Sequence, residues 1–117
     1  MKKLIEQYCE DLGKAIETQN AKLITQHFAK DATYRFRLGS GWMDVEIKDM
    51  ADSCLSYKDI KDKDFAGTTD SIDELADGRW VSVIVGSVNK KPYSTVSFFK
   101  FNGDKIVELV EYYGDFE

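Results

Sequence analysis

The sequence predicts an α+β domain, because helical periodicity in its first half gives way to strand alternation in its second half. Apolar residues recur every four positions at Leu4, Tyr8, Leu12 and Ile16, the spacing of an amphipathic helix. From residue 65 onward, alternating apolar segments are separated by turn sequences, Asp-Gly at 77–78 and Asn-Gly-Asp at 102–104. Three consecutive hairpins would form an antiparallel meander behind a helical N-terminal half.

The remaining elements follow in chain order. Asn20 is a candidate N-cap for a second helix over Ala21–Lys30, and residues 33–38 alternate strictly as a strand before Gly-Ser-Gly at 39–41. A third helix starts at about Glu46, where Ile47, Met50, Cys54 and Tyr57 have helical spacing. Strands are then expected around 68–75, 79–88, 93–101 and 105–113.

Length and composition restrict the class of protein. The 117 residues fit one domain spanning 1–117, and 43% hydrophobic with 13% aromatic residues excludes a disordered chain. The net charge of −5 argues against nucleic-acid binding, and no apolar run approaches the roughly 20 residues of a membrane span. The N-terminus has no signal-peptide core, so we expect a cytoplasmic protein. Cys9 and Cys54 are expected to be reduced core residues, and we expect neither a metal nor a cofactor.

The two faces of the predicted sheet differ in composition. One is purely apolar and comprises Val81, Val83, Val85, Val96, Phe98, Val110 and Tyr112. The other mixes polar and aromatic residues: Trp80, Ser82, Ile84, Thr95, Ser97, Phe99, Val107, Leu109, Glu111 and Tyr113. Helices can cover only one face, so we predict that the apolar face forms a homodimer and that the mixed face lines a pocket for a small apolar or aromatic molecule.

The candidate pocket residues are mostly aromatic. They are Tyr8, Leu12, Tyr34, Phe36, Trp42, Trp80, Ser82, Ser97, Phe99 and Tyr113. The hydroxyl of Tyr8 could donate to a ligand or bond to the backbone within the core. Trp42 could cover the pocket mouth or anchor the third helix from the surface.

Two residues are candidates for acid–base chemistry. Glu111 is the one carboxylate on the mixed face, and enclosure would suit it to proton transfer; the alternative is a hydrated or lysine-paired position at the rim. His27 is the only histidine and could act as a base, but its position one turn after Leu23 favours packing at the edge of the helix interface.

The pattern resembles the nuclear transport factor 2-like superfamily, in particular its SnoaL-like (polyketide-cyclase-like) branch. Residues 27–34 (His-Phe-Ala-Lys-Asp-Ala-Thr-Tyr) look like the family's entry into its first strand, and residues 99–108 and 111–115 are similar to its last hairpin and closing strand. The resemblance implies a cone-shaped, cystatin-like α+β fold, in which a curved, mostly antiparallel sheet wraps around three N-terminal-half helices and encloses a pocket. It also implies dimerisation through the outer face of the sheet.

The resemblance does not determine an activity, because this fold serves isomerases, dehydratases, cyclases, epoxide hydrolases and binding domains. Alignment with its ketosteroid isomerase branch puts Phe36, Leu12 and Ser97 where the catalytic base, tyrosine and acid would stand, so that chemistry is rejected. We therefore predict a small-molecule-binding domain. The alternative is a cofactor-free lyase, isomerase or hydrolase that uses Glu111, and a protein-docking module is a weaker alternative.

Overall fold

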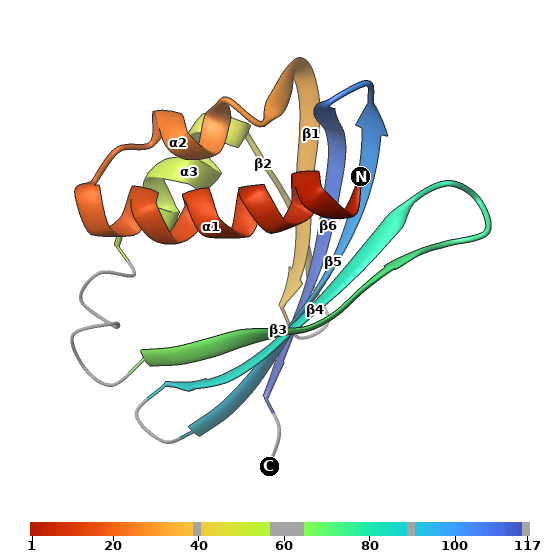
Figure 1. The fold of residues 1–117 in the computed structure, drawn as a ribbon. Coiled ribbons are helices and arrows are strands. Elements are labelled where there is room, and N and C mark those ends of the chain that lie inside the picture. The colour runs from red at the N-terminus through yellow and green to blue at the C-terminus, as the bar shows by residue number, and fades with distance from the viewer. Residues whose placement is uncertain (39–40, 57–64, 89–90, 116–117) are drawn as a thin grey trace.

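The chain forms a six-stranded curved sheet with three helices packed against its concave side (Figure 1). The computed structural model describes residues 1–38, 41–56, 65–88 and 91–115. The elements, in order, are α1 (Lys2–Thr18), α2 (Lys22–Thr25), β1 (Phe28–Leu38), β2 (Gly41–Val45), α3 (Ile47–Leu55), β3 (Phe65–Glu74), β4 (Trp80–Val88), β5 (Lys91–Asn102) and β6 (Lys105–Asp115). The predicted α+β class is therefore confirmed.

The sheet has the strand order β2-β1-β6-β5-β4-β3. The strands from β3 to β6 pair antiparallel in sequence order, which confirms the predicted meander. Only the β1–β6 pair among these strands is parallel, and it brings the first long strand beside the last. The predicted turns at 39–41 and 89–92 lie partly outside the described residues.

The second helix is much shorter than predicted. It covers Lys22–Thr25, not Ala21–Lys30, although the Asn20 side chain does accept a hydrogen bond from the Lys22 N–H (3.2 Å). The backbone already pairs with β6 at His27, whose carbonyl accepts from the Ile106 N–H (2.8 Å), and Phe28 begins β1. Pairing with the distant strand therefore overrides the local helical pattern.

Strand β2 was not predicted. Its five residues are mostly exposed and do not alternate between apolar and polar, so the usual signal of a strand is missing. It forms because it can pair antiparallel with β1 at the sheet edge, with Arg37 opposite Trp42 and Tyr34 opposite Val45.

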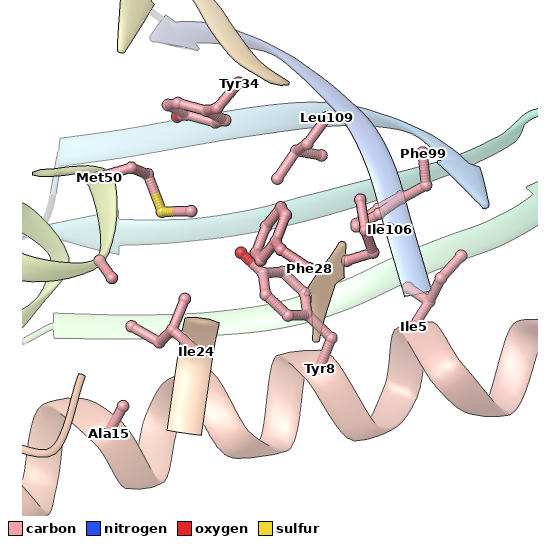
Figure 2. Packing of buried hydrophobic residues seen from close by; sticks show 11 residues of the cluster. Ile5, Tyr8, Ala15, Ile24, Phe28, Tyr34, Met50, Phe99, Ile106 and Leu109 are labelled. Atoms are coloured by element: carbon pink, nitrogen blue, oxygen red, sulfur yellow. The ribbon is translucent and has the colours of Figure 1, made fainter. Parts of the chain in front are cut away.

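The core lies between α1 and the concave face of the sheet (Figure 2). Its fully enclosed side chains include Ile5 from α1, Ile24 from α2, and Phe99, Ile106 and Leu109 from the sheet. At the C-terminal end of α1, Gln19 adopts left-handed geometry (φ 57°), and its side chain donates to the carbonyls of Ile16 (2.7 Å) and Leu55 (2.9 Å). That second bond ties α1 to α3.

A β-bulge changes one predicted facing. Lys100 pairs with Glu108 and Phe101 pairs with Ile106, which leaves Val107 as the extra residue of β6. Strict alternation put Val107 on the mixed face; the bulge instead lets both Ile106 and Leu109 reach the core, where they are buried.

The apolar face of the sheet is on the side away from the helices, because the residues that alternate with it, among them Trp80, Phe99 and Leu109, belong to the core or pack against it. Cross-strand pairing aligns Val81 with Phe98 and Val110, and Val83 with Val96 and Tyr112. These residues lie side by side on one face, as the alternation predicted.

Candidate functional site

Glu111 is the centre of a hydrogen-bonded group on the concave face. Its Oε1 accepts from the hydroxyls of Tyr34 (2.7 Å) and Tyr113 (3.0 Å), and its Oε2 accepts from the Ser97 hydroxyl (2.5 Å). Oxygens of Tyr34 and Tyr113 are themselves 3.0 Å apart. Three donors from β1, β5 and β6 thus hold the carboxylate in one position.

Strand register explains why these residues meet. Phe36 of β1, Glu111 of β6, Ser97 of β5 and Ser82 of β4 are successive cross-strand partners and so form one row on the same face. The Ser97 hydroxyl donates to the carboxylate, whereas the buried Ser82 hydroxyl has no hydrogen-bond partner within the described residues.

A cavity of about 410 Å³ opens beside this group. Its walls come from the sheet and from α3, and the residues that line it are Tyr34, Phe36, Val45, Met50, Ser53, Cys54 and Tyr113. The Phe36 ring contacts the rings of two other lining residues. Its centroid is 6.0 Å from that of Tyr34 and 5.8 Å from that of Tyr113. Glu111 is not among the lining residues, but Tyr34 and Tyr113, whose hydroxyls donate to it, both line the cavity.

Burial and the Glu111 carboxylate together raise the pKa values of neighbouring tyrosine and cysteine side chains. Desolvation, followed by the negative charge of Glu111, raises the pKa of Tyr34 and Tyr8 well above the ordinary range. The same two causes raise the pKa of the Cys54 thiol to about 12. These three groups are therefore neutral at physiological pH and cannot serve as anionic bases or nucleophiles.

The predicted pocket residues separate into two groups. Tyr34, Phe36 and Tyr113 line the cavity, and Ser97 lies behind it with Glu111. The other inward-facing candidates are part of the core: Tyr8, Leu12, Trp80, Ser82 and Phe99. The Tyr8 ring, for example, packs edge-on against Phe28 and Phe99, with centroids 5.7 and 5.9 Å away.

The prediction that Trp42 covers the mouth is wrong. Trp42 lies on the convex face, where its ring is 5.2 Å from that of Tyr112 and under the guanidinium groups of Arg35 and Arg37. Its cross-strand partner Arg37 also pairs with Tyr112, so all three point away from Glu111.

Sequence reasoning missed four lining residues. Val45, Met50, Ser53 and Cys54 come from β2 and α3. Met50 and Cys54 were recognised as the apolar stripe of a helix, but nothing local showed that this stripe faces a cavity. Val45 belongs to the strand that was not predicted.

The histidine has a buried partner outside the cavity. His27 Nε2 lies 2.7 Å from Asp11 Oδ2, and the same carboxylate accepts from Gln7 (3.0 Å) and Gln26 (3.3 Å). Burial acts to raise the pKa of Asp11, but the hydrogen bonds from His27 and Gln7 outweigh it and lower that pKa. The pair joins α1 to the residue before β1, and the His27 ring also packs edge-on against Tyr8, so His27 does contact a helix but through a hydrogen bond that the sequence did not predict.

A second hollow, of about 460 Å³, lies between α1 and β3 and is more polar. Lys2, Glu6 and Glu10 approach it from α1, and Asp70 approaches it from β3. Over the ranges the structure describes, no three His, Cys, Asp or Glu side chains are grouped so that they could hold a metal ion. None of the helices in those ranges is long and apolar enough to cross a membrane.

Solved structures share this arrangement of three helices and a curved mixed sheet. A protein assigned provisionally as a ketosteroid isomerase, from Kribbella flavida, superposes with a TM-score of 0.69 at 14% identity, over 97% of this chain and 77% of that one. An NTF-2 like protein of unknown function from Burkholderia xenovorans superposes with a TM-score of 0.66 at 17% identity, over 99% of this chain and 88% of that one. This chain has the NTF2-like fold. The same fold occurs in SalBIII, an epoxide hydrolase/cyclase-like enzyme of pyran ring formation in the polyether salinomycin. SalBIII superposes with a TM-score of 0.66 at 15% identity, over 97% of this chain and 92% of that one.

The NTF2-like assignment concerns the fold, since no family model and no curated protein sequence matches the chain. Function must be argued from the cavity and the group around Glu111.

Proposed function

We propose that this NTF2-like protein binds a small molecule in the 410 Å³ cavity, with the aromatic side chains against the body of the ligand and the Glu111 group at its polar end. The observation that carries this proposal is the combination of an aromatic wall with a carboxylate fixed by three hydroxyl donors. A binding site needs polar groups that are already in position, because ordering them on binding costs affinity.

Indole is a suitable first probe, since it is neutral, flat and smaller than the cavity. We expect millimolar indole to raise the Tm of the protein, because a ligand that binds only the folded state stabilises it by mass action. Ser53→Trp places a large ring at the cavity wall and should abolish the shift. Ser56→Trp is the matched control, because Ser56 is an exposed residue of the same helix end that does not line the cavity.

Two results would count against binding at this cavity. One is no Tm shift with indole in the unmodified protein. The other is the same shift in Ser53→Trp as in Ser56→Trp, which would locate the ligand elsewhere.

A cofactor-free acid–base enzyme is the second candidate, favoured by the single carboxylate of Glu111 beside the cavity. Against it, Glu111 does not line the cavity, whereas Tyr34 and Tyr113 do, so Glu111 would have to act through their hydroxyls. Because SalBIII is epoxide hydrolase/cyclase-like, styrene oxide is the probe: water would open the ring to give the diol. Diol formed above the buffer rate, and lost in Glu111→Gln, would favour the enzyme.

We also propose that two copies associate through the convex face. Its aligned Val81–Phe98–Val110 and Val83–Val96–Tyr112 rows are apolar, and a two-fold axis would set this face against the same face of a second copy. Light scattering should give the mass of a dimer, and Val96→Lys should give a monomer with an unchanged circular dichroism spectrum. A monomeric wild-type protein would refute this proposal. Free Cys9 and Cys54 fit the reducing cytoplasm, which we propose as the location.

A further inference from the structure

The polar end of the cavity can accept hydrogen bonds but has no hydrogen to donate. A carboxylate only accepts, so the hydroxyls of Tyr34, Tyr113 and Ser97 must each point their hydrogen at Glu111. A ligand carbonyl, carboxylate or phosphate would find no donor there, and lone pairs of oxygen would face it. A ligand that carries its own N–H groups would be complementary to this end.

The negative charge of Glu111 has no counter-ion within the described part of the chain. Ion pairs between described residues include Lys14–Glu10, Arg35–Asp44 and Arg79–Asp77, and none of these includes Glu111. The arginines of β1 point to the convex face, where they lie over Trp42. Hydroxyl donors reduce the cost of enclosing the carboxylate, but they leave its charge in place.

The rest of the wall is suited to a cation. Tyr34, Phe36 and Tyr113 present three neighbouring aromatic rings, and the faces of such rings attract ammonium groups. Met50 adds a polarisable thioether. The whole chain carries a net charge of −5, which raises the local concentration of cations and repels anions.

The effect of the carboxylate on its neighbours agrees with a negative potential in the cavity. After desolvation, Glu111 is the next cause that raises the pKa of both Tyr34 and Cys54. A field that opposes negative charge on a phenol and a thiol favours positive charge on a ligand.

We propose that the ligand is an organic cation: a protonated amine carried on an apolar or aromatic body, with its N–H directed at the hydroxyl oxygens of Tyr34 and Tyr113, which bond to the Glu111 carboxylate. This inference rests on the proposed binding function and narrows its ligand class. It disfavours carboxylates and phosphates at the Glu111 end of the cavity, whereas the Ser53 hydroxyl, which also lines the cavity, can still donate.

The test compares two probes of the same shape. Protonated N,N-dimethylbenzylamine and isobutylbenzene have the same heavy-atom skeleton and differ in the charged N–H group. Phenylacetate serves as the anionic probe. Binding is measured at pH 7 by perturbation of the backbone amide resonances in two-dimensional NMR spectra, which reports affinity and location together.

We expect the ammonium probe to bind about tenfold more tightly than isobutylbenzene, from the ring faces and the carboxylate together. Phenylacetate should not bind. In Glu111→Gln the preference for the cation should fall to about threefold or less, because the rings remain and the charge is gone. Glu108→Gln is the matched control: it removes one carboxylate from the same strand, at a position that pairs with the exposed Lys100, and should keep the full preference.

Each other outcome is informative. Equal or tighter binding of isobutylbenzene would overturn the cation inference and leave the binding function standing. If Glu111→Gln keeps the full preference for the ammonium probe over isobutylbenzene, the cation inference is likewise overturned and the binding function stands. If none of the three probes perturbs resonances of the lining residues, both the cation inference and the proposed binding function fail.

Discussion

The two serines at the centre of the sheet provide a direct test of the hydrogen-bond argument. Ser82 and Ser97 are cross-strand partners on β4 and β5, and both are almost fully buried, at 1% and 2% exposure. Substitution by alanine removes one hydroxyl oxygen in each case and little else. The partners of the two hydroxyls differ: Ser97 donates to the Glu111 carboxylate, and Ser82 has none among the described residues.

The two substitutions should therefore change stability in opposite directions. Ser97→Ala removes a hydrogen bond to a charged group, which costs about 2 kcal/mol. Ser82→Ala removes an unsatisfied buried hydroxyl and should stabilise the fold by about 0.5–1 kcal/mol. An unfolding entropy of about 2.1 cal/mol/K per residue gives about 250 cal/mol/K for 117 residues, so 1 kcal/mol moves Tm by about 4 °C.

Thermal unfolding followed by circular dichroism should then show Ser97→Ala about 8 °C below wild type and Ser82→Ala about 2–4 °C above it. The Ser82/Ser97 double variant should show a near-additive Tm, because the two hydroxyls do not bond to each other. Equal losses in the two single variants would refute the reasoning, since they would mean that the Ser82 hydroxyl makes a hydrogen bond of similar value.

Three further predictions concern the backbone, the buried Asp11 carboxylate and the cavity thiol. Gly103→Ala should lower the free energy of unfolding by about 1 kcal/mol, because Gly103 has φ +63°. Gly13→Ala inside α1 should raise the free energy of unfolding by about 0.5–1 kcal/mol. Both positions have free space for a Cβ, so changes of the same sign in urea denaturation would contradict the backbone argument. The lowered pKa of Asp11 contributes stability that is present above about pH 4, the unfolded value, and is lost as the pH falls through the folded value. Urea denaturation between pH 5 and pH 2 should thus show a smaller acid loss in Asp11→Asn than in wild type, and identical losses would remove this carboxylate from the pH dependence. The pKa of the Cys54 thiol is raised to about 12, so in a Cys9→Ser background this thiol should react with Ellman's reagent at pH 8 at least about 100-fold more slowly than an unstructured cysteine peptide. Adding Glu111→Gln should accelerate the reaction. A rate like that of the peptide in the Cys9→Ser protein would show an accessible thiolate and contradict the prediction.

Where the strands are regular, the sequence was sufficient to predict which residues share a face, whereas the bulge at Val107 was not predicted. Strict alternation along β5 and β6 put Ser97, Glu111 and Tyr113 together, and the hydrogen bonds now join them. A period of two residues determines facing wherever a strand is regular, so no distant information was needed.

Pairings between distant segments could not be predicted in this way. The place of Trp42 could not be predicted, because β2 carries no alternation and only its register with β1 decides where its side chains point. Similarly, the Asp11–His27 contact joins residues that are 16 positions apart in two different elements. The helical stripe that contains Met50 was visible, but the empty space beside it depends on how α3 is seated against β1.

The parallel pairing of β1 with β6 has a consequence for the order in which the molecule is assembled. The Tyr34–Glu111 hydrogen bond joins residues that are 77 positions apart in the chain. One edge of β1 pairs with β2, and the other edge pairs with β6. During synthesis on the ribosome, β1 emerges early and must wait unpaired along one edge until β6 has been made. Loop closure over that distance is slow, so folding of the sheet should be limited by this one late contact. We therefore expect the Tyr34–Glu111 contact to be among the last to form.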